Sequence, residues 1–453
     1  MTALKQIVEE LFPLHRTLVS DGTDRALEIV GSHLPDAAVY GIERFPPGAP
    51  VWTWRVPERW TVHEAYLETE DGRRVIDFAE NPLHLVSYSE PIDSLVTWEE
   101  LEPHLHYSAD RPRAIPWEFR YYERSWGFCL PKHLFDELPR GIRYRAVIRS
   151  EFGDGVADGL AVGCATLEPE GNAGTELPEV LLCAHVCHPA QANDDASGVA
   201  SLIGVAERLA ARPLPAGSMR VRLLFCPETI GSICYLSHHE DLVERLRGGL
   251  FCEMTGNDNT LVLQRSLQND HTLDRIAIHV MTRRFGDRFR QGAFRRVIVN
   301  DEMVINGPGV GAPCLSLSRW PYAEYHTSDD NPSIIGEEQL AEAADVIEEI
   351  VRIFATDYVP RRTFRGPLFL SGLGLWVDWR TDPELNLALD TVMLSLEGEH
   401  SVFDIASQSG LDYWTTRHYV DRLRERGLVN AIGSVTSRER DRANAVLAME
   451  KSC

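Results

Sequence analysis

Short, continuously apolar segments alternate with helical segments between residues 155 and 356, and this alternation is the strongest constraint on the fold. The segments VLLCAHV (180–186) and RVRLLFCP (220–227) have the length and aliphatic character of buried strands. Helices are expected at 197–212 and 336–356, where apolar residues recur with helical spacing. Strands without a polar face that alternate with helices predict a layered α/β fold around a mostly parallel sheet.

The N-terminal part of the chain divides into two stretches. Residues 1–40 have helical periodicity, and we assign them with 155–360 to one discontinuous domain. Residues 41–154 are rich in Trp, Tyr, Pro and β-branched residues and predict an inserted β-rich domain. Two of its strands are expected to join in a hairpin at Asp71-Gly72.

Residues 361–453 predict a linker followed by a winged helix. Three short helices are expected, the last two joined at Ser409-Gly410 with helix-turn-helix spacing. The last helix is basic, as a DNA-reading helix would be, through Arg417, His418, Arg422, Arg424 and Arg426. Asp421 and Glu425 interrupt this basic face. The whole chain has 45 Lys+Arg against 68 Asp+Glu, a net charge of −23 that disfavours nucleic acid and anionic membranes as partners.

Neither a membrane span nor a secretory signal is predicted. The longest apolar runs are far shorter than the roughly 20 residues that a spanning helix needs, and the N-terminal segment MTALKQIVEELFPLH is amphipathic. The chain has nine scattered cysteines, which predict reduced thiols and a cytoplasmic protein: Cys129, Cys164, Cys183, Cys187, Cys226, Cys234, Cys252, Cys314 and Cys453. The sequence leaves a homo-oligomer open.

Acidic and imidazole side chains follow the predicted strands. His185 lies at the end of VLLCAHV, Glu228 follows RVRLLFCP, and Glu253 lies near the end of GLFCEM. Asp194 precedes the helix at 197–212, and His326 follows the strand segment APCLSLS. Ligands of parallel sheets bind outside the carboxyl ends of the strands, so these five side chains are expected at one edge. Imidazole and carboxylate together bind Zn²⁺, and two ions that share a bridging carboxylate need about five such ligands.

Four motifs, AHVCHPAQANDDASG, PETIGS, FCEMTG and YHTSDDN, resemble the metal motifs of zinc aminopeptidases of the M28 type. The whole chain resembles bacterial aminopeptidase-like proteins of the DUF4910/DUF2172 type, because VWTWRVPERWTVHEAY, NPLHLVSYSEP and ERSWGFCL are similar to the insertion of that group. The resemblance implies a three-layer αβα zinc-exopeptidase domain of the phosphorylase/hydrolase-like kind. It also implies an inserted small β-rich domain and a C-terminal winged helix.

The resemblance also implies roles for the five side chains. His185 and Glu253 would hold a first zinc ion, Glu228 and His326 a second, and Asp194 would bridge the two. One or two ions would activate a water molecule for attack on the substrate. Asp195 follows the bridging residue, with a helix cap as its alternative role.

Two positions depart from the family pattern. Cys187 stands where the family has an aspartate that orients the ligand histidine. Pro227-Glu228 stands where the family has two glutamates, a general base followed by a metal ligand. Glu228 is therefore either the ligand, which we favour, with the base coming from elsewhere, or the base, with a second metal site that is weak or absent. His188, Asp329 or Asp330 could substitute for the missing glutamate.

For each of these candidates, and for two nearby tyrosines, the sequence leaves a second role open. His188 could be a third imidazole ligand or a histidine bonded to a loop carbonyl. Asp329 and Asp330 could form a solvated turn. Tyr322 and Tyr325 are candidate pocket residues, with core packing as the alternative.

The expected function is metal-dependent hydrolysis of peptide or peptide-like amide bonds, as an aminopeptidase acting on a small substrate. The insertion and the winged helix are both expected to wall the cleft. Three alternatives stay open: a catalytically altered binding protein, a DNA-binding regulator that uses the winged helix, and an amidase or deacylase acting on a small metabolite such as an N-acylated sugar.

Overall fold

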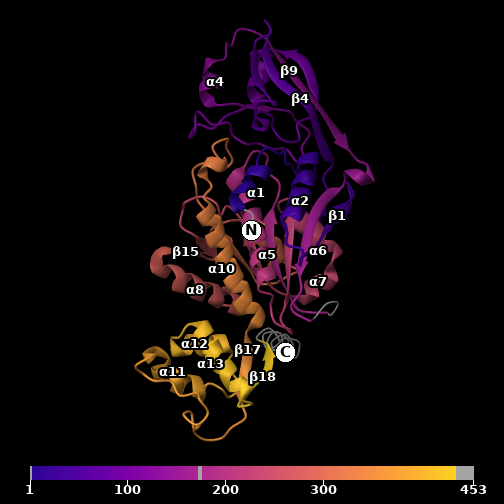
Figure 1. The fold of residues 1–453 in the computed structure, drawn as a ribbon. Helices are drawn as coiled ribbons and strands as arrows, with labels where there is room; N and C mark the ends of the chain where they lie inside the picture. The colour runs from indigo at the N-terminus through magenta and orange to yellow at the C-terminus, as the bar shows by residue number, and fades with distance from the viewer. Residues whose placement is uncertain (1–2, 172–175, 435–453) are drawn as a thin grey trace, which may run out of the picture.

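A computed structural model describes residues 3–171 and 176–434 and is built around one large mixed sheet (Figure 1). In sheet order the eight strands are β1 (Val39–Phe45), β10 (Leu160–Leu167), β12 (Arg220–Cys226), β11 (Glu179–His185), β13 (Leu246–Cys252), β16 (Cys314–Ser318), β14 (Val262–Gln264) and β15 (Arg290–Gly292). The four central strands β12, β11, β13 and β16 are parallel, as predicted. β10 and β14 run antiparallel to them at the two sides.

Helices cover both faces of this sheet, because alternate residues of its buried strands point to opposite sides. Leu182 packs in one apolar cluster with residues of α1 (Leu4–Leu11), α2 (Asp21–His33), α5 (Gly198–Ala211), α8 (Thr272–Phe285) and α10 (Glu337–Thr356). Its neighbour Leu181 packs in a second cluster with residues of α6 (Ile230–His238), α7 (Glu240–Arg245) and α9 (Glu302–Ile305). The sheet is therefore the middle layer of three.

A second, four-stranded antiparallel sheet lies at one end of the molecule (Figure 1). Its strands are, in order, β5 (Arg74–Asp77), β4 (Arg59–Thr69), β9 (Tyr144–Gly153) and β6 (Ile92–Val96). The predicted hairpin at Asp71-Gly72 joins β4 to β5, and Gly72 adopts the φ of +86° that such a turn requires. The large sheet includes β1, part of which falls within the 41–154 segment expected to form the insertion.

Short elements complete the segment around the second sheet. They are β2 (Pro50–Val51), β3 (Trp54–Arg55), η1 (Pro82–His84), α3 (Trp98–Leu101), η2 (Glu102–His104), β7 (Leu105–His106), β8 (Phe128–Cys129), α4 (Lys132–Glu137) and η3 (Val156–Asp158). Three further short helical turns, η4 (Ala192–Ser197), η5 (Gly286–Arg288) and η6 (Pro332–Ile334), lie in the α/β part.

Three helices lie at the opposite end of the molecule (Figure 1). They are α11 (Pro383–Leu394), α12 (Val402–Ser409) and α13 (Tyr413–Glu425). Gly410 ends α12 in the left-handed region, with a φ of +70°, as the predicted helix-turn-helix junction requires. β18 (Val429–Ser434) pairs with β17 (Tyr358–Arg362), which ties this unit to the end of α10. Its classification as a winged helix remains a prediction.

The described residues include eight cysteines, all of them free thiols. This agrees with the predicted reduced state, and Cys453 lies outside the described residues. Across residues 3–171 and 176–434, no helix combines the length and the apolar character that crossing a membrane would require.

Candidate metal centre

The predicted ligands gather at the carboxyl edge of the parallel strands. His185 is the last residue of β11, Glu253 directly follows β13, and Glu228 lies just beyond β12. Asp194 lies in η4, where the chain turns into α5. His326 comes from the loop after β16. Parallel strands end at the same edge of a sheet, so the topology explains why residues far apart in the sequence meet here.

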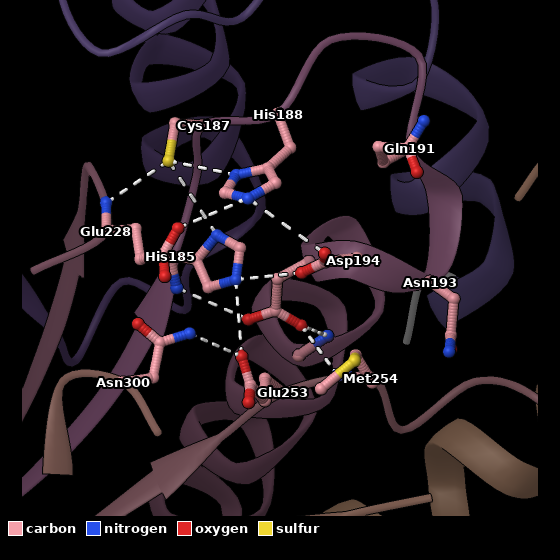
Figure 2. Close-up of polar contacts among 12 residues, drawn as sticks. His185, Cys187, His188, Gln191, Asn193, Asp194, Glu228, Glu253, Met254 and Asn300 are labelled. Carbon is pink, nitrogen blue, oxygen red and sulfur yellow. Dashed lines mark hydrogen bonds and ion pairs between the residues drawn. The ribbon is translucent and has the colours of Figure 1, made fainter. Parts of the chain in front are cut away.

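Asp194 is the centre of this cluster (Figure 2). Its Oδ1 lies 3.0 Å from His185 Nε2, and its Oδ2 lies 3.0 Å from His326 Nε2 and 3.9 Å from His188 Nε2. Glu253 Oε2 lies 3.4 Å from His185 Nε2. The carboxylate of Asp194 therefore belongs to two groups of candidate ligands, His185–Asp194–Glu253 and His188–Asp194–His326, each with its ligand atoms within 4.8 Å of one another.

Both groups fit a divalent cation. Two ligand atoms about 2.0–2.1 Å from a tetrahedral zinc ion lie about 3.3 Å apart. The N–O separations of 3.0, 3.4 and 3.0 Å between the histidines and the carboxylates are close to this value. Nε2 of His185 and Nε2 of His326 are buried and make no hydrogen bond within the described part of the chain. Their lone pairs are therefore available to a cation.

The electrostatics of the site also favour a cation. Burial alone would raise the pKa of Asp194, but the imidazoles of His188, His185 and His326 hold it well below its usual value. Burial raises the pKa of Glu253 to about 7, because the neighbouring His185 offsets only part of the desolvation. A divalent cation would supply the missing positive charge and favour the ionised form of both carboxyls.

Cys187 lies two residues after His185, at the position where the resemblance in sequence implies an orienting aspartate. Its Sγ lies 3.1 Å from His188 Nδ1 and 3.8 Å from His185 Nδ1, behind both rings as seen from Asp194 (Figure 2). Burial opposes ionisation of the thiol, but His188 and His185 lower the pKa of Cys187 to about 7. The thiol thus contacts the far nitrogens of two candidate ligands, as an orienting carboxylate would.

Glu228 lies beside the centre but in neither group of candidate ligands. Its Oε2 lies 3.2 Å from His188 Nε2, and its backbone N–H donates a hydrogen bond to Cys187 Sγ over 3.1 Å. The side chain is 31% exposed, whereas that of His188 is 2% exposed. Burial raises the pKa of Glu228, but the hydrogen bond from His188 and the charges of His188 and His185 together outweigh this effect and lower it. Glu228 is thus an ionised carboxylate at the solvent side of the cluster.

Two other acids hold the loop of Asp194 in place. Asp195 accepts hydrogen bonds from Gly198 N–H (2.9 Å) and Met254 N–H (3.0 Å), so it satisfies the start of α5. Asp330 accepts hydrogen bonds from Asn193 N–H (2.6 Å) and Asp194 N–H (3.2 Å). Asp330 is fully buried, so the alternative of a solvated turn is wrong for this residue. Asp330 also accepts a hydrogen bond from the hydroxyl group of Tyr322 (2.6 Å).

A segment around Trp117, within the residues 41–154 that are predicted to form the insertion, also belongs to the site, and no sequence motif indicated it. Trp117 N–H donates to the backbone oxygen of His326 over 2.8 Å, and Ile115 and Ser328 exchange two further hydrogen bonds. The Trp117 ring packs 4.1 Å from the His188 ring and 4.6 Å from the His326 ring, measured between centroids. No spacing in the sequence connects these segments.

The expectation that the C-terminal helices also wall the cleft is wrong. The C-terminal helices lie at the far end of the molecule from the insertion (Figure 1), whereas Trp117 of the insertion contacts the cluster. They therefore cannot line this cleft.

A cavity of about 570 Å³ opens between the loop after Glu253 and the loop that carries His326. Tyr322 lines this cavity and also packs in an apolar cluster, so both of its predicted roles stay open, and Tyr325 stacks on His326 with ring centroids 3.7 Å apart. Amide and carboxylate side chains dominate the polar part of the lining: Asn257, Asp258, Asn259, Glu324 and Gln339. Such a lining suits a polar or cationic ligand group better than an anionic one.

This fold and this cluster of imidazoles and carboxylates define an aminopeptidase-like α/β protein. The model of the DUF4910 family, a domain of unknown function, matches residues 5–357, and the chain belongs to this family. A Clostridium acetobutylicum protein described as a polysaccharide biosynthesis protein with an aminopeptidase-like domain is 31% identical over 428 residues. The match covers 92% of this chain and 93% of the relative.

Solved structures agree with this assignment. The crystal structure of a C. acetobutylicum protein described as a peptidase has a TM-score of 0.82 at 30% identity and covers 95% of this chain and 96% of its own. A zinc aminopeptidase from Bacillus subtilis has a TM-score of 0.58 at 14% identity, covering 77% of this chain and 92% of its own. A peptidase M28 precursor from Shewanella amazonensis has a TM-score of 0.53 at 15% identity, covering 78% and 93%. The two latter similarities show the fold alone.

Proposed function

We propose that this protein is a metal-dependent hydrolase of peptide or peptide-like amide bonds, acting as an aminopeptidase on a small substrate. The observation that carries the proposal is the shared Asp194 carboxylate, whose two oxygens belong to two groups of candidate metal ligands. The aminopeptidase-like relatives support the same reaction class. Zinc, as one or two ions, is the cation that these imidazole and carboxylate donors fit.

The chain's own residues supply the rest of the chemistry. When bound, a divalent cation would polarise the substrate carbonyl and lower the pKa of water. Asp194 would keep both groups in register, and Glu228, at the exposed side, is placed to hold a proton. Asp258 and Glu324 line the cavity beside the His326 loop, and a protonated amino terminus is the kind of group that such a negatively charged lining would attract.

The test is metal content together with hydrolysis. Protein purified without chelator is analysed for metals and assayed on dipeptides and aminoacyl amides with added Zn²⁺, Co²⁺ or Mn²⁺. We expect metal-dependent release of the amino-terminal residue. Asp194→Asn should abolish both metal retention and turnover. Asp345→Asn, at an exposed acid on α10 that pairs with Arg208, should change neither.

A metal-loaded protein that cleaves none of these substrates would contradict the proposal and favour the altered binding protein. A second candidate function is deacylation of an N-acylated sugar. The description of the clostridial relative, which mentions polysaccharide biosynthesis, favours it. N-acetylated amino sugars therefore belong in the substrate panel.

We further propose a cytoplasmic location without a nucleic-acid partner. The eight free cysteines support a reducing compartment. Two basic residues of α13 are engaged within the protein: Arg417 donates to Thr356 O and Arg422 donates to Gly374 O. These hydrogen bonds reduce the number of donors that the helix offers to phosphate groups.

A further inference from the structure

We propose that His188 completes the second metal group with Asp194 and His326, and that Glu228 stays outside the metal ligands as the residue that transfers protons. This inference rests on the proposed metal-dependent hydrolase and specifies its site. It departs from the family pattern at the ligand alone: where that pattern has a glutamate ligand beside a glutamate base, the imidazole of His188 would take the place of the ligand. It also reverses the preference for Glu228 as ligand that the sequence alone favours.

Atom positions separate the two candidates. His188 Nε2 lies 3.9 Å from Asp194 Oδ2 and within 4.8 Å of the ligand nitrogen of His326. Glu228 belongs to no group of three candidate ligand atoms that meets this limit in the part of the chain that is described. His188 therefore converges with the other two ligands, whereas Glu228 approaches the group only through His188.

The surroundings of His188 fix which nitrogen is available. Cys187 Sγ lies 3.1 Å from Nδ1, so Nδ1 is occupied, and Nε2 is the nitrogen that faces the carboxylates of Glu228 (3.2 Å) and Asp194 (3.9 Å) (Figure 2). Trp117 packs on the ring, with centroids 4.1 Å apart. The backbone of His188 has a φ of +86°, which is strained for a residue with a Cβ. A packed and strained histidine at a site of convergent ligands is typical of a functional residue.

The carboxylate of Glu228 is then free for proton transfer. As water attacks the amide carbon, one O–H bond of the water breaks and Glu228 accepts the proton. As the C–N bond breaks, Glu228 returns this proton to the leaving nitrogen, and the products are a carboxylic acid and an amine. No proton or electron is gained or lost overall.

The experiment counts metal ions in variants. Protein is loaded with Zn²⁺, dialysed against a weak chelator and analysed for zinc per chain, and turnover is measured in parallel. We expect His188→Ala to retain one ion fewer than the wild type. Glu228→Gln should retain the wild-type count while its turnover falls by about 10²–10⁴-fold. His84→Ala is the matched control, because His84 is a buried histidine of the insertion bonded to Cys129 O.

The outcomes are distinguishable. A wild-type zinc count in His188→Ala, or loss of an ion in Glu228→Gln, overturns the assignment of His188. Absence of metal from the wild type overturns both this inference and the proposed function. A wild type that binds metal but hydrolyses nothing overturns the proposed function and the proton transfer by Glu228, whereas the zinc counts still decide whether His188 is a ligand.

If the His188→Ala variant does not fold, a measurement on the wild-type protein tests the same assignment. In Co²⁺-substituted wild type, each ligand histidine gives a strongly shifted proton resonance. We expect resonances from three histidines. Resonances from His185 and His326 only would overturn the assignment.

Discussion

At the scale of single residues, a thiol takes the place of a carboxylate. Cys187 contacts the far nitrogens of His185 and His188 and accepts the backbone N–H of Glu228. One side chain thereby orients residues of both metal groups and of the proposed proton carrier. The single sulfur atom lies beside the imidazoles of two neighbouring histidines, so one side chain supports both of them.

We expect Cys187→Ala to weaken Zn²⁺ binding by about 10–100-fold, because both imidazoles lose the partner that orients them. Cys187→Asp should restore most of this affinity. The measurement is competition for zinc with a chromophoric chelator. Cys234→Ala, at another buried free thiol, serves as the control and should bind zinc like the wild type.

Equal affinity in Cys187→Ala and the wild type would contradict the orienting role. A sulfur-to-cobalt charge-transfer band in the Co²⁺ protein would instead make Cys187 a direct ligand, since its Sγ also lies within 4.8 Å of ligand nitrogens of His185 and His188.

At the scale of elements, β11 has different chemistry at its two ends. Its carboxyl end carries His185, and its amino end carries Glu179, whose side chain is fully buried. Glu179 pairs with Arg220 (3.0 Å), Arg222 (2.8 Å) and Arg245 (3.2 Å). These arginines come from β12 and α7, so the network joins neighbouring elements at the edge of the sheet remote from the metal centre.

We expect Glu179→Ala to lower the free energy of unfolding by about 3 kcal/mol. The substitution removes the buried carboxylate whose negative charge all three arginines share. Zinc per folded chain should not change, since the network lies at the other end of β11. Urea denaturation followed by circular dichroism measures the first effect. Asp345→Asn removes an exposed ion pair and should cost less than about 1 kcal/mol; a similar loss in both variants would contradict the prediction.

The sequence predicted elements better than contacts. The strand at 180–186 and the helices at 197–212 and 336–356 are confirmed within one or two residues, because their apolar patterns are long and regular. Residues that directly follow strands could also be placed at one edge. The contact of Trp117 with His326 could not be predicted, because no local pattern connects segments that lie about 200 residues apart.

The orientation of the side chains at the site could not be predicted from the sequence either. Whether His188 or Glu228 faces Asp194 depends on a backbone with a φ of +86° at His188. Nothing in the composition around Asp330 indicated that this acid is buried under the loop it holds.

At the scale of the whole molecule, the α/β core lies between the insertion and the C-terminal helices (Figure 1). The junction with the C-terminal helices contains Asp357, a buried acid between α10 and β17 that accepts a hydrogen bond from Phe403 N–H (3.1 Å). Burial raises the pKa of Asp357 to about 7, partly offset by Ser401 and the Phe403 amide; nearby Asp404 raises it further and Arg417 lowers it. The junction therefore contains a carboxyl that folds most favourably in its neutral form.

This makes stability at the junction depend on pH. An unfolded Asp ionises near pH 4, whereas folded Asp357 ionises near pH 7. The contribution of Asp357 is therefore fully present below about pH 4 and is lost as the pH rises to about 7. We expect Asp357→Asn to lack this loss, so its thermal midpoint relative to wild type should rise between pH 5 and pH 8. Differential scanning calorimetry at both values tests this.

Asp390→Asn, at an exposed acid on α11, is the control and should follow the wild type at both pH values. A constant difference between Asp357→Asn and the wild type across this range would contradict the prediction.

The pairing of the insertion with the loop of His326 has a consequence for how the protein is made. Ribosomes deliver the chain from its amino end, so Trp117 is synthesised first, and His185, Asp194 and Glu253 all emerge before His326. All residues of the first metal group are thus synthesised before the loop that completes the second group. The pairing of Trp117 with His326 can form only after about 200 intervening residues have been added, so we expect the second group to be the last part of the site to assemble.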